Sequence, residues 1–315
     1  AMSKFSSEAL KRDSKKFVVI VGPCSIHSER GALEYANLLA EMQKNMPDEI
    51  ALVMRCYLEK PRSGRGWRGF ISDPNHEGLC NPIEGLRRGR ELLKQIKALG
   101  VPMAYEYVDP LIAGFVEEYV DIGVVGARTI SSQGHRQLVA SSNHPFLLKN
   151  GVDGGIKVAL DTIDVVKLHG RFPKVSDQGK LEFIHASGNN DIGLVLRGGD
   201  GFTNYDINHV TDAYSELSRF HPTRLVIDTS HGNSGKSAKR QEQVIIKIIE
   251  DLETYLPMTS GIMIESYLNY GRQDLDGVHT DYSISVTDEC ISWESTAVML
   301  GLLASKYREV TNSAN

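Results

Sequence analysis

Eight short apolar runs that alternate with helical stretches constrain the fold of this chain more than any other feature. The runs are FVVIVG (17–22), ALVM (51–54), PMAYE (102–106), VVGA (124–127), FLL (146–148), GLVL (193–196), RLVID (224–228) and GIMI (261–264). Between the runs, apolar residues recur at helical spacing, as at Ala32, Tyr35 and Leu39 of the predicted helix Glu29–Gln43. Strands that alternate with helices are typical of a parallel sheet. Eight such units predict an α/β fold, the (β/α)8 or TIM barrel.

Two insertions interrupt this pattern, and no linker divides the chain. Further helices are predicted at Pro82–Ala98, 111–119, 136–142, 155–167, 207–220, 237–255 and 293–308. The insertion 170–187 has the pattern of a hairpin, which we expect to lie over the barrel, and 269–287 is a long polar loop. Loops of this length on a compact barrel are usually functional. We therefore expect one catalytic domain, residues 1–315, in which 1–16 form a short N-terminal extension.

The composition restricts the class of protein. Apolar residues make up 41% of the chain and charged residues 24%, which is ordinary for a soluble enzyme. The net charge of −5 gives no reason to expect nucleic acid or an anionic membrane surface as a partner. No apolar run approaches the about 20 residues that span a bilayer, and the polar N-terminus lacks a signal-peptide core. The four cysteines fit no disulfide framework. These features indicate a cytoplasmic protein.

Four residues with metal-binding side chains lie at or beyond the carboxyl ends of predicted strands. They are Cys24, His231, Glu265 and Asp288. The carboxyl ends of all strands in such a barrel converge on one face, so we expect these side chains to meet. A thiolate, an imidazole and two carboxylates suit a borderline transition metal. Each residue alone is more typical of a structural role, because a lone cysteine after a strand is usually buried and a lone glutamate near a strand end often forms an ion pair. Their shared location favours a metal site.

Cationic side chains also follow the predicted strands, and Glu106 ends the third run. The cations are Arg55, Lys60, Arg62, Arg128, Lys149 and Arg197. Guanidinium groups bind carboxylate and phosphate through paired hydrogen bonds. Like charges at close range repel each other strongly, so the cluster predicts a polyanion or two anionic groups as ligands. Arg65 and Arg68, in the same stretch, are predicted to be surface residues.

Longer motifs built around these residues are similar to those of one known family. The motifs are VGPCSIH, RCYLEKPRSGRGWRGFISDP, GARTISSQGHR, LKNGVDG, LRGG, IDTSHGNSGK, GIMIES and SVTDECISWEST. In this order they resemble type I 3-deoxy-D-arabino-heptulosonate 7-phosphate (DAHP) synthase, a transferase. The resemblance extends from about Ser7 to Tyr307. It implies the condensation of phosphoenolpyruvate with erythrose 4-phosphate and water on a (β/α)8 barrel, the first step of the shikimate pathway to chorismate and the aromatic amino acids.

The resemblance also implies a role for each candidate residue. A divalent metal ion would be held by Cys24, His231, Glu265 and Asp288. Phosphoenolpyruvate would be bound by Arg55, Lys60, Glu106, Ala127, Arg128, Lys149 and Arg197, and erythrose 4-phosphate by Lys60, Pro61, Arg62 and Ser63. The expected catalytic residues are Lys60, Glu106, Lys149 and His231. We expect Mn²⁺, Fe²⁺, Co²⁺ or Zn²⁺ as the metal, with Mn²⁺ supporting activity in vitro, and a homodimer or homotetramer.

Three departures from the family pattern leave alternatives open. Ser63 replaces the threonine of the family's KPRT stretch, and Asp177 in SDQG stands where the family commonly has lysine. GPCSIH begins at Gly22, so a shorter arm precedes it than in feedback-regulated members, and we expect little inhibition by phenylalanine, tyrosine or tryptophan. One alternative is a phosphoenolpyruvate-dependent synthase for another aldose phosphate, such as arabinose 5-phosphate. The other is a non-catalytic phosphoenolpyruvate-binding barrel.

Overall fold

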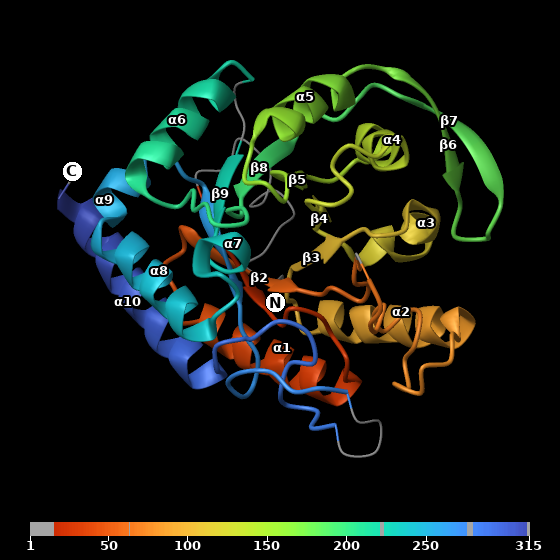
Figure 1. The fold of residues 1–315 in the computed structure, drawn as a ribbon, viewed down its shortest axis with the longest axis horizontal. Helices are drawn as coiled ribbons and strands as arrows, with labels where there is room; N and C mark the ends of the chain where they lie inside the picture. Colours follow the sequence, from red (N-terminus) through yellow and green to blue (C-terminus); the bar gives the residue numbers. More distant parts are fainter. Residues whose placement is uncertain (1–15, 63, 221–223, 276–279, 314–315) are drawn as a thin grey trace.

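The structure, a computed structural model, describes residues 16–62, 64–220, 224–275 and 280–313. At its centre, parallel strands form a closed barrel in the order β1–β10–β9–β8–β5–β4–β3–β2 (Figure 1). These strands are β1 (Phe17–Gly22), β2 (Ile50–Arg55), β3 (Met103–Glu106), β4 (Ile122–Val125), β5 (Phe146–Lys149), β8 (Ile192–Leu196), β9 (Arg224–Asp228) and β10 (Gly261–Glu265). Each overlaps one of the eight predicted apolar runs, so the predicted (β/α)8 barrel is confirmed.

Two apolar layers explain why the barrel strands appear in the sequence as continuous apolar runs. Val18 and Ile20 of β1 face the barrel interior, whereas Val19 and Val21 of the same strand pack in the layer between the strands and the helices. All four side chains are buried, with at most 2% of their surface exposed. A strand that is buried on both faces has no polar positions, which distinguishes it from the alternating pattern of a half-exposed strand.

Helices surround the barrel, and four of them start at a polar side chain that caps the first turn. The helices are α1 (Glu29–Gln43), α2 (Pro82–Ala98), α3 (Ala113–Val116), α4 (Gln133–Ser141), α5 (Lys157–Val166), α6 (Ile207–Ser218), α7 (His231–Ser234), α8 (Ala238–Glu250), α9 (Leu252–Tyr255) and α10 (Trp293–Ser313). The caps Ser28, Asn81, Asp206 and Ser237 each accept a hydrogen bond from a backbone N–H in the first turn.

Two of the predicted helices are broken. The predicted helix 111–119 consists of the single turn α3 between two 3-10 turns, and φ at Val116, where α3 ends, is −120°. The predicted helix 237–255 divides into α8 and α9 at Asp251, where ψ is 23°. Neither break displaces a barrel strand.

The predicted hairpin exists, but its predicted position over the barrel is wrong. Strands β6 (Gly170–Val175) and β7 (Leu181–Ala186) pair antiparallel and pack against α3 and α4 on the outside of the barrel (Figure 1). Gly114 of α3 permits this contact, because a Cβ there would lie 2.0 Å from the carbonyl oxygen of Val175. A groove of about 560 Å³ separates the hairpin from these helices. Asp177, which departs from the family pattern, lines that groove.

The second insertion packs along the start of α1. The Tyr267 hydroxyl donates to the carbonyl oxygen of Tyr282 at 2.8 Å, and His27 Nε2 lies 3.2 Å from the carbonyl oxygen of Asp281. Arg30 of α1 lies over the ring of Tyr282. These contacts fix the described part of the loop, which leads to Asp288.

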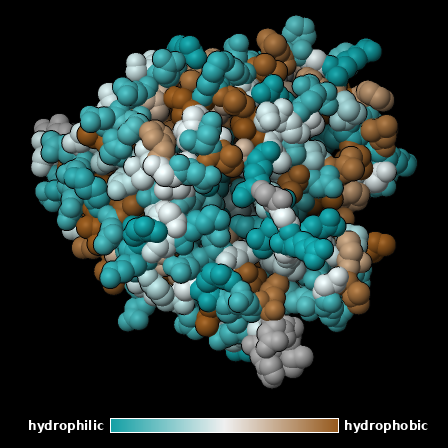
Figure 2. All heavy atoms as spheres, viewed as in Figure 1, coloured by the Kyte–Doolittle hydropathy of each residue, from teal (hydrophilic) through white to brown (hydrophobic). Residues whose placement is uncertain are grey.

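The face of the molecule in Figure 2 is mostly hydrophilic, with apolar side chains scattered over it. Within the described ranges, no helix is both long enough and apolar enough to cross a membrane. The predicted N-terminal extension lies outside the described residues, apart from Lys16.

Gly85→Ala is expected to destabilise the fold, although alanine is the better helix former. α2 packs so closely on the loop after β2 that a Cβ on Gly85 would lie 2.0 Å from the carbonyl oxygen of Ile71. Relieving this overlap requires a shift of α2, at a cost of about 1–3 kcal/mol. Gly301→Ala in α10 is the matched control: nothing lies within 4 Å of its added Cβ, and helix propensity favours it by about 1 kcal/mol. Thermal unfolding of the two variants should therefore shift in opposite directions, and a stabilised Gly85→Ala would contradict the packing.

Candidate active site

One pocket at the carboxyl ends of the barrel strands gathers the predicted substrate residues. Its lining contains the predicted Arg55, Lys60, Pro61, Arg62, Glu106, Ala127, Arg128, Lys149, Arg197, His231 and Asp288, together with Tyr57 and Lys236. The pocket has a volume of about 60 Å³. Ser63, predicted for the acceptor site, lies outside the described residues. Residues that end or follow seven different strands therefore meet, as the barrel topology requires.

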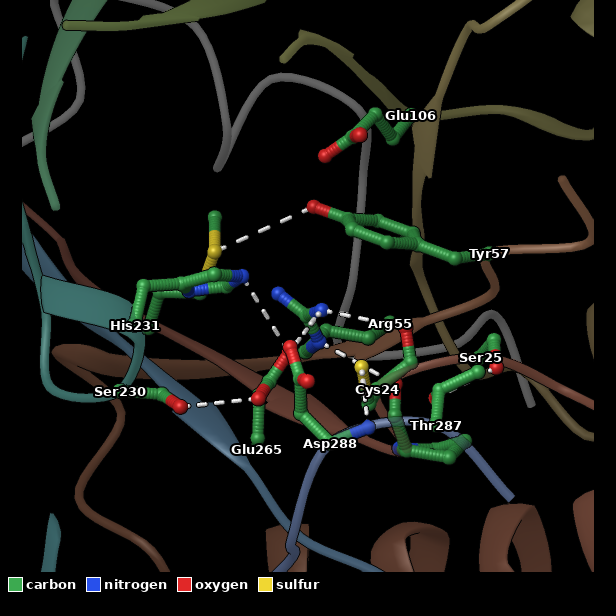
Figure 3. Close-up of polar contacts among 12 residues, drawn as sticks. Cys24, Ser25, Arg55, Tyr57, Glu106, Ser230, His231, Glu265, Thr287 and Asp288 are labelled. Atoms are coloured by element: carbon green, nitrogen blue, oxygen red, sulfur yellow. Dashed lines mark hydrogen bonds and ion pairs between the residues drawn. The ribbon is translucent and has the colours of Figure 1, made fainter. Parts of the chain in front are cut away.

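Three of the four predicted metal ligands form a compact cluster at the base of this pocket. Cys24 follows β1, Glu265 ends β10, and Asp288 belongs to the loop before α10 (Figure 3). One ligand atom from each lies within 4.8 Å of the others. The backbone N–H of Asp288 points to Cys24 Sγ at 3.4 Å, which fixes the two residues side by side. The cluster can hold a metal ion.

His231, the fourth predicted ligand, lies beside this cluster. Its Nε2 is 3.6 Å from Glu265 Oε1, and its Nδ1 is 2.8 Å from Asp228 Oδ2. His231 begins α7 with φ at 49°, in the left-handed region that non-glycine residues rarely occupy. The sequence analysis did not predict the single turn α7, whose geometry turns the imidazole toward Glu265 (Figure 3).

Burial and charge oppose each other in the cluster. Burial, together with the Glu265 carboxylate, raises the pKa of the Cys24 thiol to about 11, against the opposing effect of Lys60. Burial also raises the pKa of Asp288, but Lys60 and Lys236 outweigh it and lower that pKa to about 2. Glu265 is held below its ordinary pKa in the same way, because His231 and Arg55 outweigh its burial. The Glu265 and Asp288 carboxylates are therefore ionised. The Cys24 thiol between them would lose its proton only if a further positive charge were bound nearby.

This donor set fits a divalent cation. Sulfur, imidazole nitrogen and carboxylate oxygen together suit transition metals such as Mn²⁺, Fe²⁺, Co²⁺ and Zn²⁺. A bound cation also supplies the positive charge that deprotonates a buried thiol. Two lysines border the cluster, since Lys60 Nζ lies 2.7 Å from Cys24 Sγ and Lys236 Nζ lies 3.2 Å from Asp288 Oδ1.

Three cations of the pocket are buried, which points to an anionic ligand. Arg55, Lys149 and Arg197 expose 0%, 3% and 8% of their surface. Arg55 pairs with Glu265 at 3.0 Å and lies over the ring of Tyr57. Its Nη1 has no hydrogen-bond partner among the described residues. A buried donor without a partner is costly, so Arg55 Nη1 is available to bind an acceptor atom of a ligand.

Two buried carboxylates flank Lys149. Its Nζ lies 3.6 Å from Glu106 Oε2 and 3.4 Å from Asp228 Oδ2. Burial raises the pKa of Glu106, but Lys149 and Lys60 outweigh it and hold that pKa below its ordinary value. Asp228 is likewise held well below its ordinary pKa, because His231 and Lys149 outweigh its burial. Both carboxylates are therefore ionised, and Glu106 is available as a proton acceptor.

The site contains three residues that the sequence analysis did not assign, namely Tyr57, Asp228 and Lys236. Asp228 ends the apolar run RLVID, and an acidic residue that closes a fully buried strand is itself a signal of a site. Lys236 is held near Asp288 by a left-handed backbone, with φ of 63°, directly after Gly235. Tyr57 stands two residues beyond Arg55, and no motif distinguished it from an ordinary core tyrosine.

Comparison with known proteins identifies a family. The family model "DAHP synthetase I family" matches residues 4–300. A tyrosine-inhibited phospho-2-dehydro-3-deoxyheptonate aldolase of Schizosaccharomyces pombe is 39% identical over 305 residues, covering 95% of this chain and 82% of that protein. The Phe-sensitive phospho-2-dehydro-3-deoxyheptonate aldolase of Escherichia coli is 38% identical over 297 residues, covering 94% of this chain and 85% of that protein.

A solved structure agrees with these sequence matches. The phospho-2-dehydro-3-deoxyheptonate aldolase of Francisella tularensis superimposes with a TM-score of 0.90 at 35% identity, covering 95% of this chain and 88% of that chain. Fold, site and sequence together place the chain in the DAHP synthetase I family.

Proposed function

We propose that the protein condenses phosphoenolpyruvate with erythrose 4-phosphate and water to give DAHP and inorganic phosphate. The observation that carries this proposal is the convergence of three buried cations on a pocket that adjoins a sulfur, nitrogen and carboxylate donor set. The names of the relatives support the same activity. The reaction is a transferase step, in which the enolpyruvyl carbon skeleton is joined to an aldose phosphate.

Phosphoenolpyruvate carries a carboxylate and a phosphate, which match the buried end of the pocket. We assign Arg55, Arg128, Lys149 and Arg197 to these two anionic groups, with Lys60, Glu106 and Ala127 completing the site. The unpartnered Arg55 Nη1 is a donor for this ligand. The backbone of Arg197 is fixed by Asn150, whose Oδ1 accepts the Arg197 N–H at 2.7 Å, so the guanidinium is positioned before the ligand arrives.

We assign the metal to Cys24, His231, Glu265 and Asp288. When bound there, the ion would supply Lewis-acid polarisation of the aldehyde carbonyl of erythrose 4-phosphate. Metal identity follows availability as much as affinity, so Mn²⁺, Fe²⁺, Co²⁺ and Zn²⁺ all suit these donors.

The remaining steps use the chain's own residues. C3 of phosphoenolpyruvate attacks the aldehyde carbon, whose oxygen takes up a proton and becomes a hydroxyl group. Positive charge develops at C2, where water adds with loss of a proton. The resulting hemiketal phosphate releases inorganic phosphate by C–O cleavage and leaves a ketone at C2. Glu106 accepts a proton from that water, and Lys149, 3.6 Å away, retains the ammonium charge that holds the substrate anion. Lys60 lies between the metal ligand Cys24 and the pocket, where it contacts both substrates.

Phosphate release tests the proposal against its alternatives. Purified protein with Mn²⁺ should release phosphate when phosphoenolpyruvate and erythrose 4-phosphate are both present, and a chelator should abolish the release. Faster release with arabinose 5-phosphate would establish the alternative acceptor. Binding of phosphoenolpyruvate without release with either sugar would establish a non-catalytic barrel.

Arg62→Ala should impair use of the aldose phosphate rather than binding of phosphoenolpyruvate. Arg62 stands at the exposed mouth of the pocket, and its Nε donates to the carbonyl oxygen of Trp67 at 2.8 Å, which orients the guanidinium. Loss of a charge-assisted contact to the distal phosphate should lower kcat/KM for erythrose 4-phosphate by the equivalent of about 2–4 kcal/mol. Arg65→Ala, an exposed cation in the same loop outside the pocket lining, is the control. Weaker phosphoenolpyruvate binding alone in Arg62→Ala would show that the two anion sites are reversed.

We further propose a homodimer or homotetramer. Leu181 and Phe183 of β7 expose 65% and 71% of their surface, which supports self-association through the hairpin. Light scattering coupled to size exclusion measures the assembly directly.

A further inference from the structure

Asp228 lies between a residue that we assign to phosphoenolpyruvate, Lys149, and a residue that we assign to the metal, His231. It is fully buried at the end of β9, where its Oδ2 lies 3.4 Å from Lys149 Nζ and 2.8 Å from His231 Nδ1. Oδ2 and Nδ1 are both buried, and neither forms a hydrogen bond of regular geometry with a described residue. Asp228 Oδ2 is therefore close to both the Lys149 ammonium and the His231 imidazole. We assign the first of these groups to phosphoenolpyruvate and the second to the metal.

The backbone holds this carboxylate rigidly. Its Oδ1 accepts the N–H of Ser230 at 3.0 Å, and the Asp228 carbonyl oxygen accepts from Asn233 Nδ2 at 2.8 Å. Both partners belong to the turn that carries His231 in its left-handed conformation. Such a backbone persists only where surrounding contacts determine it. Asp228 thus fixes the direction in which the imidazole points.

Acidic and basic side chains alternate in a continuous series across the pocket. Glu106 lies 3.6 Å from Lys149, Lys149 lies 3.4 Å from Asp228, and Asp228 lies 2.8 Å from His231. Beyond it, His231 Nε2 lies 3.6 Å from Glu265 in the metal cluster. Within this series, Asp228 contacts Lys149, which we assign to phosphoenolpyruvate binding, and His231, which we assign to the metal site.

We propose that Asp228 is a positioning residue that couples metal binding to phosphoenolpyruvate binding. A proton on His231 Nδ1 facing Asp228 leaves the Nε2 electron pair directed at the metal site, as in other carboxylate–histidine–metal arrangements. The same carboxylate holds the Lys149 ammonium where the substrate anion binds. Either ligand therefore acts on the binding of the other through this one carboxylate. This inference rests on the proposed function of the site.

Asp228→Asn tests the coupling, because the amide keeps the shape of the side chain without its charge. Dissociation constants for Mn²⁺ are measured by competition with a chromophoric chelator, with and without phosphoenolpyruvate, and those for phosphoenolpyruvate by calorimetry, with and without Mn²⁺. In the wild type, each ligand should tighten the other about tenfold. In Asp228→Asn, Mn²⁺ should bind about 10- to 100-fold more weakly, and the mutual effect should disappear.

The matched control is Asp206→Asn. Asp206 and His209 form another Asp–His pair three residues apart, at the start of α6 and outside the pocket, with 2.5 Å between Oδ2 and Nδ1. This variant should keep both dissociation constants and their mutual effect. If Asp228→Asn does not fold, as judged by thermal unfolding, Asp228→Glu carries the same measurements, since it keeps the charge but displaces it.

The outcomes separate the inference from the proposed function. A wild-type protein that binds neither Mn²⁺ nor phosphoenolpyruvate would refute the proposed function. A different result would overturn only the role of Asp228. In that case the wild type binds both Mn²⁺ and phosphoenolpyruvate, but a folded Asp228 variant keeps the wild-type Mn²⁺ affinity or the full mutual effect.

Discussion

Cys24→Ala is expected to lose nearly all turnover while keeping the barrel. Cys24 Sγ supplies the sulfur donor of the cluster with Glu265 and Asp288, and its side chain is completely buried. Substitution of residues that only support metal ligands costs about 10- to 100-fold, so loss of a ligand itself should lower kcat by at least about 100-fold. The fold should lose only about 1 kcal/mol, the typical effect of one substitution.

Cys56→Ala is the matched control for that experiment. Cys56 is also a free, fully buried cysteine, but among the described residues it does not belong to the cluster that could hold a metal ion. The two variants should show similar thermal unfolding, while metal content and turnover fall only in Cys24→Ala. Full activity of Cys24→Ala in metal-free buffer would remove the metal assignment.

Lys149→Met should lower kcat/KM for phosphoenolpyruvate by about 30- to 5,000-fold, the equivalent of about 2–5 kcal/mol, because the substrate anion loses a buried charged partner. Methionine has similar length but no charge, so Glu106 and Asp228 lose the cation that lies 3.6 and 3.4 Å from them. A buried carboxylate left without its partner costs about 3–5 kcal/mol, so the variant should also unfold at lower temperature.

Lys174→Met controls for removal of a lysine from an ion pair. Lys174 contacts Glu117 at 2.6 Å in the groove beside the hairpin, where the lysine side chain is 24% exposed. A pair of this kind contributes less than about 1 kcal/mol, and activity should not change. Near wild-type kcat/KM in Lys149→Met would show that Lys149 takes no part in the reaction.

The sequence predicted the barrel and most of the pocket because both depend on local patterns. β1 and β10 are continuous apolar runs, and residues that end such runs must converge once the barrel closes. The predicted position of the hairpin was wrong because the pattern of 170–187 specifies that two strands pair but not the surface on which they pack. That surface depends on the absence of a side chain at Gly114, in a helix distant in sequence.

Asp228 and the turn α7 were missed for a related reason. A run such as RLVID predicts a strand, whereas the role of its last residue depends on Lys149 and His231, which only the folded barrel brings within 3.4 and 2.8 Å. The left-handed backbone at His231 has no signature in the sequence, because non-glycine residues seldom adopt it.

The identity of the product tests the central claim most directly. Protein incubated with Mn²⁺, phosphoenolpyruvate and erythrose 4-phosphate should yield, by mass spectrometry, one new compound with the combined mass of both substrates plus water minus phosphoric acid. Its amount should equal the phosphate released and the erythrose 4-phosphate consumed. Release of phosphate with pyruvate as the product and erythrose 4-phosphate unchanged would contradict the account.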